Sequence, residues 1–261
     1  MAIIDIHAFA KCSGLERVVI PASVKEIGRG AFSNCKSLKE VKFLGDNTKI
    51  DTGVFEGCTA LTTVDLPKKI KELPAFAFKN CTNLANITLP NTLKSIKVQA
   101  LQNTAITDVY IPANITEVEP YAFNFNTATS IVVDPKNPAY DSRDNCNAVV
   151  STKDNKLAFT CPVSTISNSI KIIGTDAFVN IKDTKIVIPN GVTTIEGYAF
   201  YDCDNVKVVV PDSVKELKET IYGLHVFENP NNYGYGPEKK PTVVKTNNPI
   251  VIEYCKKSRI N

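Results

Sequence analysis

The residues of this chain best suited to chemistry are its eight cysteines and two histidines. Thiols can form disulfides, bind zinc, act as nucleophiles, or pack as small apolar side chains. No Cys-x-x-Cys pair occurs, so neither a zinc site nor a thioredoxin-like site has support. Five cysteines recur at one position of a regular spacing, and we interpret them as a column of reduced, buried core thiols. These five are Cys12, Cys35, Cys58, Cys81 and Cys203.

The other candidates for catalysis lack the partners they would need. A cysteine nucleophile requires an imidazole beside a thiol of low pKa, and Cys255 is the only plausible thiol neighbour of His225. The carboxylate pair Glu117 and Glu119 falls on a turn with no pocket signature, so we interpret both as solvated charges. The sequence therefore predicts no enzyme: it offers no catalytic residue, no metal ligand and no cofactor site.

Length and charge exclude further classes of function. The chain has 261 residues, with 30 basic against 27 acidic side chains and a formal net charge of +3. That balance does not suit a protein that binds nucleic acid or an acidic membrane surface through a basic field. No apolar run reaches the roughly 18–20 residues that a membrane-spanning helix needs. We therefore expect no nucleic-acid partner and no membrane span in this chain.

A repeat of 22 to 23 residues organises the sequence. Its first mark is an Ala-Phe pair, or a close variant, three residues before the cysteine position. The pairs begin at Ala8, Ala31, Val54, Ala77, Ala100, Ala122, Ala177 and Ala199. Its second mark is a triplet with apolar first and third residues, usually followed by proline. The triplets lie at 18–20, 41–43, 64–66, 87–89, 109–111, 131–133, 186–188 and 208–210.

Each triplet is expected to form a short strand whose first and third side chains point inward, and the proline ends it because proline cannot donate to the ladder. One repeat buries no core alone. Stacked at about 4.8 Å per coil, the triplets form a parallel sheet over columns of inward apolar side chains. The sequence predicts a right-handed solenoid of roughly eight or nine coils with few long helices.

The repeat resembles leucine-rich repeats, with Leu-x-x-Val-x-Ile at 15–20 and Leu-x-x-Val-x-Phe at 38–43. More narrowly, Ile-Gly-x-x-Ala-Phe-x-x-Cys-x-x-Leu at 27–38 is similar to the BspA-like leucine-rich repeat family of surface proteins. The resemblance covers residue 3 to about 217. It implies a leucine-rich repeat solenoid, a β/α superhelix of mostly short parallel strands. It also implies a cell-surface or secreted location, with adhesion to host, matrix or other surface proteins.

The spacing fails between Phe123 and Phe178, where 55 residues hold one coil and an insertion placed at about 134–166. Within it, residues 147–159 predict a β-hairpin. This stretch also resembles the hairpin coil inside many BspA-like domains. Cys146 and Cys161 flank the hairpin, where either a cross-strand disulfide or two thiols would fit. We interpret residues 1–217 as one solenoid domain that contains this enlarged coil.

After Pro211 the Ala-Phe mark is lost, and residues 218–261 are expected to cap the same domain. A loop rich in Asn, Pro, Gly and Tyr at 229–241 leads to a strand at 242–244. Asn248 at the N-cap and Pro249 at the first helical position then predict a short helix. Since residues 3–15 already form the second half of a coil, we expect upstream sequence, which could include a signal peptide, to precede residue 1.

The middle residue of each triplet points outward, and these residues define the candidate binding face. Lys42, Asp65 and Thr88 are typical of an ordinary wet surface. The later triplets give an apolar stripe with two lysines beside it: Tyr110, Val132, Val187 and Val209, with Lys185 and Lys207. Such a stripe marks either an interface or a surface that another segment covers, here the insertion or the C-terminal tail.

These observations favour a non-catalytic, adhesion-type interaction module that binds a protein or other macromolecule through the sheet face of the solenoid. The alternative is a structural spacer or stalk within a longer surface protein. An enzyme would need a convergent polar cluster that the sequence does not contain. Substitutions at Tyr110 and Val187 separate the first two hypotheses, because a spacer should not respond to them.

Overall fold

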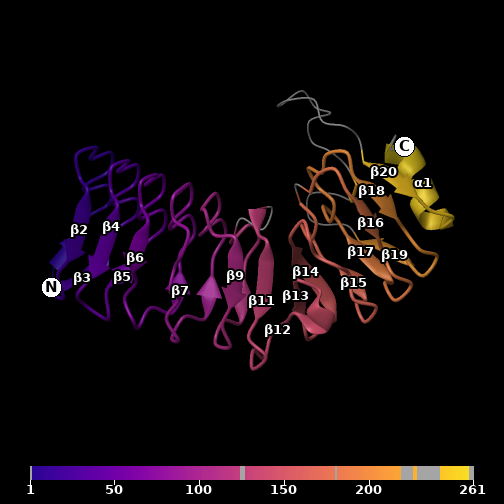
Figure 1. Cartoon of the computed structure of the whole chain (residues 1–261), viewed down its shortest axis with the longest axis horizontal. Coiled ribbons are helices and arrows are strands. Elements are labelled where there is room, and N and C mark those ends of the chain that lie inside the picture. The colour runs from indigo at the N-terminus through magenta and orange to yellow at the C-terminus, as the bar shows by residue number, and fades with distance from the viewer. Residues whose placement is uncertain (1, 124–126, 180, 219–225, 228–241, 259–261) are drawn as a thin grey trace. The chain divides into compact units, whose positions relative to one another are not determined.

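The computed structural model describes residues 2–123, 127–179, 181–218, 226–227 and 242–258. They form a parallel β-solenoid of about ten turns with a spacing of about 22 residues and little helix (Figure 1). The turns exceed the eight or nine expected because parts of the insertion and of the C-terminal segment continue the ladders. This architecture confirms the predicted fold class.

The chain divides into two compact units. The first unit comprises Met1–Asn124 and Asp134–Pro138, and the second comprises Phe125–Val133 and Ala139–Asn261. Each is described by itself below. The assignment of residues 1–217 to one domain capped by 218–261 stays a prediction.

In the first unit, each coil contributes short strands to parallel ladders at a step of one repeat. One ladder is β1 (Ala2–Ile4), β3 (Val24–Ile27) and β5 (Lys49–Ile50); a second is β2 (Arg17–Ile20), β4 (Glu40–Phe43) and β6 (Thr63–Asp65). A third is β7 (Glu72–Leu73), β8 (Ser95–Ile96) and β10 (Glu117–Val118), and β9 spans Asp108–Ile111. Strands β2, β4, β6 and β9 confirm the predicted triplets there.

The triplet at 87–89 is an exception, because it forms no strand in the part of the chain that the structure describes. A side chain links this region to the preceding coil instead. The hydroxyl of Thr92 has one proton, which the carbonyl oxygens of Lys68, at 2.7 Å, and Ile70, at 2.8 Å, share. This coil therefore keeps the repeat spacing of the sequence without the strand pairing that we expected.

Phenylalanine rings and cysteine thiols form two columns inside the first unit. The rings of Phe9, Phe32, Phe55 and Phe78 stack with successive centroid distances of 5.2, 5.5 and 5.5 Å. Each thiol donates to a phenylalanine carbonyl of the preceding coil: Cys35 to Phe9 at 3.0 Å, Cys58 to Phe32 at 3.2 Å, and Cys81 to Phe55 at 3.2 Å. All eight cysteines are free thiols, which agrees with the interpretation of the five at the repeat position. Of the two alternatives for Cys146 and Cys161, the structure shows two thiols and not a disulfide.

In the second unit the insertion is part of the solenoid ladder. Strands β13 (Ala148–Ser151) and β14 (Lys156–Thr160) form the predicted antiparallel hairpin. On one side β12 (Tyr140–Asp141) pairs with β13. A 3₁₀ turn at Arg143–Asn145 lies between these two strands in the chain. On the other side β14 pairs in parallel with β15 (Ile172–Ile173), which continues to β17 (Thr194–Glu196) and β19 (Glu216–Lys218). The second ladder consists of β16 (Lys185–Val187), β18 (Lys207–Val209) and β20 (Val243–Lys245), while β11 spans Ser130–Val133.

A helix caps the last coil, as predicted. Helix α1 spans Pro249–Ser258, and Asn248 Oδ1 accepts the amide of Ile250 at 3.0 Å (Figure 1). The Nδ2 group of Asn248 donates to the carbonyl of Val214 at 2.8 Å, which ties the cap to the coil. Tyr254 is buried against Phe227. His225 and the expected loop at 229–241 lie outside the described residues.

Candidate partner-binding surface

The outward face of β2, β4 and β6 in the first unit carries charges that neutralise one another. Arg17 Nε lies 3.0 Å from Glu40 Oε2, and parallel register places Lys42 beside Asp65. Such exposed pairs add little stability, but they leave no uncompensated field. This part of the solenoid has the wet, mixed surface that the sequence predicted.

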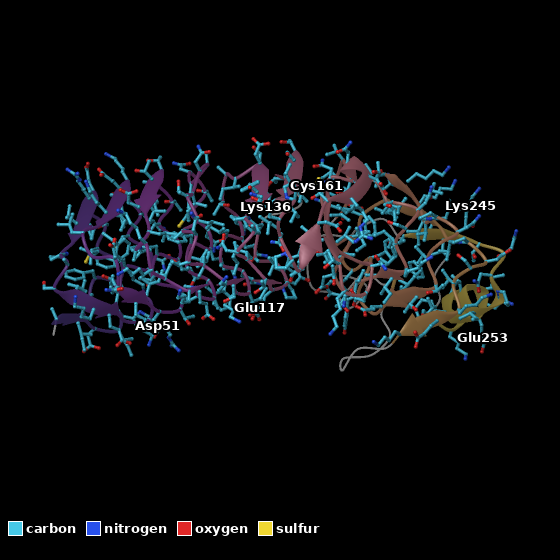
Figure 2. The ribbon with its side chains drawn as sticks, turned by 90° about the horizontal axis from the view of Figure 1, so that it is seen from below. Asp51, Glu117, Lys136, Cys161, Lys245 and Glu253 are labelled. Carbon is cyan, nitrogen blue, oxygen red and sulfur yellow. The ribbon has the colours of Figure 1, made fainter. Side chains whose placement is uncertain are left out.

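Tyr110 lies on β9 of the first unit and is 52% exposed. Its hydroxyl donates to Asp134 Oδ2 at 2.7 Å, and this hydrogen bond raises the pKa of Tyr110. The Lys136 amide also donates to Asp134, at 2.8 Å, and these two donors lower the pKa of that carboxyl group. The ring is therefore both exposed and held in place. Lys136 is labelled in Figure 2.

Strands β16, β18 and β20 of the second unit present one face made only of lysine and valine. Parallel register aligns Lys185 with Lys207 and then Val243, and aligns Val187 with Val209 and then Lys245. We call these six residues the lysine–valine face. Val187 is 55% exposed and Val243 is 40% exposed. The described part of the insertion therefore leaves this face open.

The three lysines of this face, Lys185, Lys207 and Lys245, have no acidic ion-pair partner among the described residues. Contact with Lys245, followed by burial and by the charge of Lys185, lowers the pKa of Lys207. The shift has this direction because neighbouring positive charges disfavour protonation. The lysine–valine face is therefore a local positive surface on a chain that is nearly neutral overall.

Four of the six predicted site residues lie together on one sheet, and the other two lie on strands outside that sheet. Val187, Val209, Lys185 and Lys207 lie on adjacent strands of one sheet. Val132 is 47% exposed on β11, which lies outside that sheet, and Tyr110 belongs to the first unit. The insertion lies between β11 and β16 in the chain. Its own strands belong to the ladder of β15, β17 and β19.

Val243 and Lys245 complete the face and were missed as site residues. The strand at 242–244 was expected, but its pairing partner was not, because irregular sequence separates it from β18. The alternation of Val243, Val244 and Lys245 carried the available signal: Val244 is the least exposed of the three. Extending the outward positions by one strand would have found both residues.

Burial keeps the thiols of Cys58 and Cys81 in the protonated, unreactive form. Burial raises the pKa of Cys58 to about 12, and it raises the pKa of Cys81 as well. Thiolate is the nucleophilic form, so these side chains are poor nucleophiles at neutral pH. Among the described residues, no group of three or more His, Cys, Asp or Glu is arranged to hold a metal ion. No described helix has the length and apolar character needed to cross a membrane.

Comparison with known proteins identifies the repeat. The family model for the BspA type leucine rich repeat region matches residues 2–129 and 159–232, in six copies. No curated protein matches the chain significantly.

Several solved structures share the fold. A leucine rich cell surface protein from Faecalibacterium prausnitzii A2-165 is 22% identical with a TM-score of 0.55, and the match covers 95% of this chain and 83% of that one. A leucine-rich repeat protein from Bacteroides ovatus is 19% identical with a TM-score of 0.56, over 94% and 75% of the two chains. The pneumococcal vaccine antigen PcpA is 19% identical with a TM-score of 0.62, over 78% of this chain and 58% of that one. With the family model matching most of its length, the chain belongs to the BspA type leucine-rich repeat family.

Proposed function

We propose that this chain is a non-catalytic interaction module that binds a protein partner through the lysine–valine face of its second unit. The observation that carries the proposal is the row of Lys185, Lys207 and Lys245, which has no acidic partner among the described residues and lies beside exposed valines. Charge sets orientation and association rate, while apolar contacts supply the desolvation energy that holds a complex together. A partner with an acidic, partly apolar surface matches both features.

The family supports this assignment. Repeats of this kind are typically non-catalytic, and solenoids bind extended partners along their faces. The F. prausnitzii neighbour is described as a cell surface protein and the pneumococcal neighbour as a vaccine antigen. We accordingly place this chain at a cell surface or outside the cell, with host, matrix or other surface proteins as partners and adhesion as its role. Tyr110 offers a second contact in the first unit, because an anchored ring adds contact area at low entropic cost.

The test is Val187→Glu, with Val19→Glu as its matched control. Both valines are outward and exposed on parallel strands, but Val19 lies on the charge-balanced face of the first unit. Binding of each variant to a panel of purified matrix and serum proteins is measured by biolayer interferometry. We expect Val187→Glu to abolish binding and Val19→Glu to retain it, with little change in melting temperature for either.

Two results would contradict the proposal. Equal binding by both variants would support the alternative, a structural spacer that does not depend on its face. A loss of about 2 kcal/mol or more of stability in Val187→Glu is the cost of burying an unpaired charge, and it would show that the face is covered.

A further inference from the structure

Among the strands that the structure describes, β16 lies at the edge of its sheet. Lys207 N donates to Thr184 O at 2.9 Å, and Ile188 N donates to Val209 O at 3.0 Å. These two bonds fix the phase of the ladder, so the backbone groups of the intervening Lys185 and Val187 point to the other edge. No strand of the described chain pairs with β16 on that edge.

A hollow of about 330 Å³ lies beside this edge in the second unit. One wall is β16, and the apolar side chains of Phe178 and Ile181 line the interior. The volume is at the lower end of the range of roughly 300–1,000 Å³ for ligand pockets. It can therefore accept side chains from a bound segment.

The opposite wall, Cys161 to Ile166, cannot complete the sheet. Pro162 has no amide hydrogen to donate. Cys161 N donates to Ser164 Oγ at 2.8 Å, Ser164 N donates back to Cys161 O at 3.0 Å, and Thr165 N donates to Cys146 O at 2.9 Å. These amides are satisfied within the insertion, so none of them is available to β16.

In β11, side-chain oxygens accept backbone amides that no neighbouring strand accepts. Ile131 N donates to Asn147 Oδ1 at 2.6 Å, and Val133 N donates to Ser142 Oγ at 3.0 Å. Proteins cover strand edges in such ways because an open edge pairs with other chains. Lys185 and Val187 have no corresponding side-chain acceptor among the described residues.

We propose that the open edge of β16 and the adjoining hollow bind an extended, acidic peptide segment of the partner, which adds to the sheet as a strand. Main-chain bonds to Lys185 and Val187 supply affinity, and alternate side chains supply specificity. Apolar side chains enter the hollow toward Phe178 and Ile181, and outward carboxylates lie beside Lys185, with Lys207 one strand further on. In Figure 2, Cys161 of the wall and Lys245 of the lysine row are both labelled on the upper side of the second unit. This inference rests on the proposed function, since Lys185 and Val187 belong to both sites.

The test uses two short fluorescein-labelled peptides with the full chain: one alternates valine and glutamate, and the other alternates valine and lysine. Fluorescence anisotropy at low salt should detect binding of the glutamate peptide only, weakening as salt rises. Val187→Pro removes one edge donor and should weaken binding about tenfold. Val187→Thr keeps the amide at similar size, and its affinity should stay within about twofold of the native chain.

Amide hydrogen exchange measured by NMR gives a readout that does not depend on a variant folding. The amides of Lys185 and Val187 should exchange rapidly in the free chain and become protected when the glutamate peptide is added. Protection of both amides in the free chain would overturn the proposal, because the chain would already occupy its own edge. Equal binding of the two peptides, or equal affinities for Val187→Pro and Val187→Thr, would also overturn it.

The two proposals fail in different ways. If Val187→Glu loses protein binding but the peptide does not protect the edge amides, strand addition at β16 is rejected and the lysine–valine face remains the proposed binding site. If the peptide protects the edge amides but Val187→Glu and Val19→Glu bind the protein panel equally, strand addition at β16 remains and the lysine–valine face is rejected as the protein-binding site.

Discussion

Replacement of Phe55 by alanine tests whether the ring column holds the first unit together. Phe55 is fully buried and stacks on both neighbours, with ring centroids 5.5 Å from those of Phe32 and Phe78. Deleting a buried phenylalanine side chain costs about 3–5 kcal/mol. Since the flanking rings are fixed by their own coils and cannot close the gap, we expect about 4–5 kcal/mol.

Two variants separate burial from stacking. Phe55→Leu keeps most of the volume and loses both ring contacts, so we expect about 1–2 kcal/mol. Phe9→Ala removes the end of the same column, where the ring is 43% exposed and stacks on one side only, so we expect about 1–2 kcal/mol.

Equilibrium urea denaturation followed by circular dichroism measures the free energy of unfolding for all three. In a solenoid each coil contacts only its neighbours, so a gap at Phe55 also separates the coils on either side. The reasoning is wrong if Phe55→Ala and Phe9→Ala cost the same.

Three further predictions concern the thiols, an ion cluster and the cap. Thiol titration after denaturation without reductant should find eight free thiols; three or four disulfides would reject the column of reduced cysteines. Lys97 Nζ lies 2.9 Å from Glu119 and 3.0 Å from Glu117, and these contacts raise the pKa of Lys97. Burial raises the pKa of Glu119, but hydrogen bonds from Lys97 and from a backbone amide outweigh this and lower it. The stabilisation is thus present at neutral pH and lost as the pH falls through the lowered pKa. Lys97→Met should reduce the melting temperature more at about pH 7 than at about pH 3, and an equal reduction at both would contradict the cluster. Asn248→Ala should cost about 1–2 kcal/mol in urea denaturation, and Asn248→Asp, which keeps the helix-cap acceptor but turns a buried carboxylate oxygen toward the Val214 carbonyl, should cost at least as much.

Periodicity predicted the ladders because each coil repeats the same burial requirement. The alternation in Val18, Val19 and Ile20 is reproduced as buried, exposed and buried side chains on β2. The fixed step of the cysteines likewise predicted their column, since a residue at one repeat position meets its counterpart one coil away. In both cases the interaction partner is set by the spacing alone.

Pairings that depend on distant, irregular segments could not be predicted in this way. The hairpin was visible in the sequence, but its entry into the ladder through β14 and β15 depends on tertiary packing. The tether between Tyr110 and Asp134 joins an outward residue to the start of the insertion, and no periodic signal marks it. Pairing of β20 with β18 spans an interruption of the repeat, so Lys245 was not recognised as a neighbour of Lys207.

The two sheet faces differ in how their charges are arranged. The like charges on the lysine–valine face are not required by the fold. A solenoid multiplies every outward position into a row, with neighbours about 4.8 Å apart across each ladder. On β2 and β4 that register places Arg17 beside Glu40, whereas on β16 and β18 it places Lys185 beside Lys207. Like charges opposite one another are unfavourable, and an acidic residue at either position would relieve the repulsion without altering the core. An anionic strand bound beside β16 would supply the missing charge and pair the open edge at the same time.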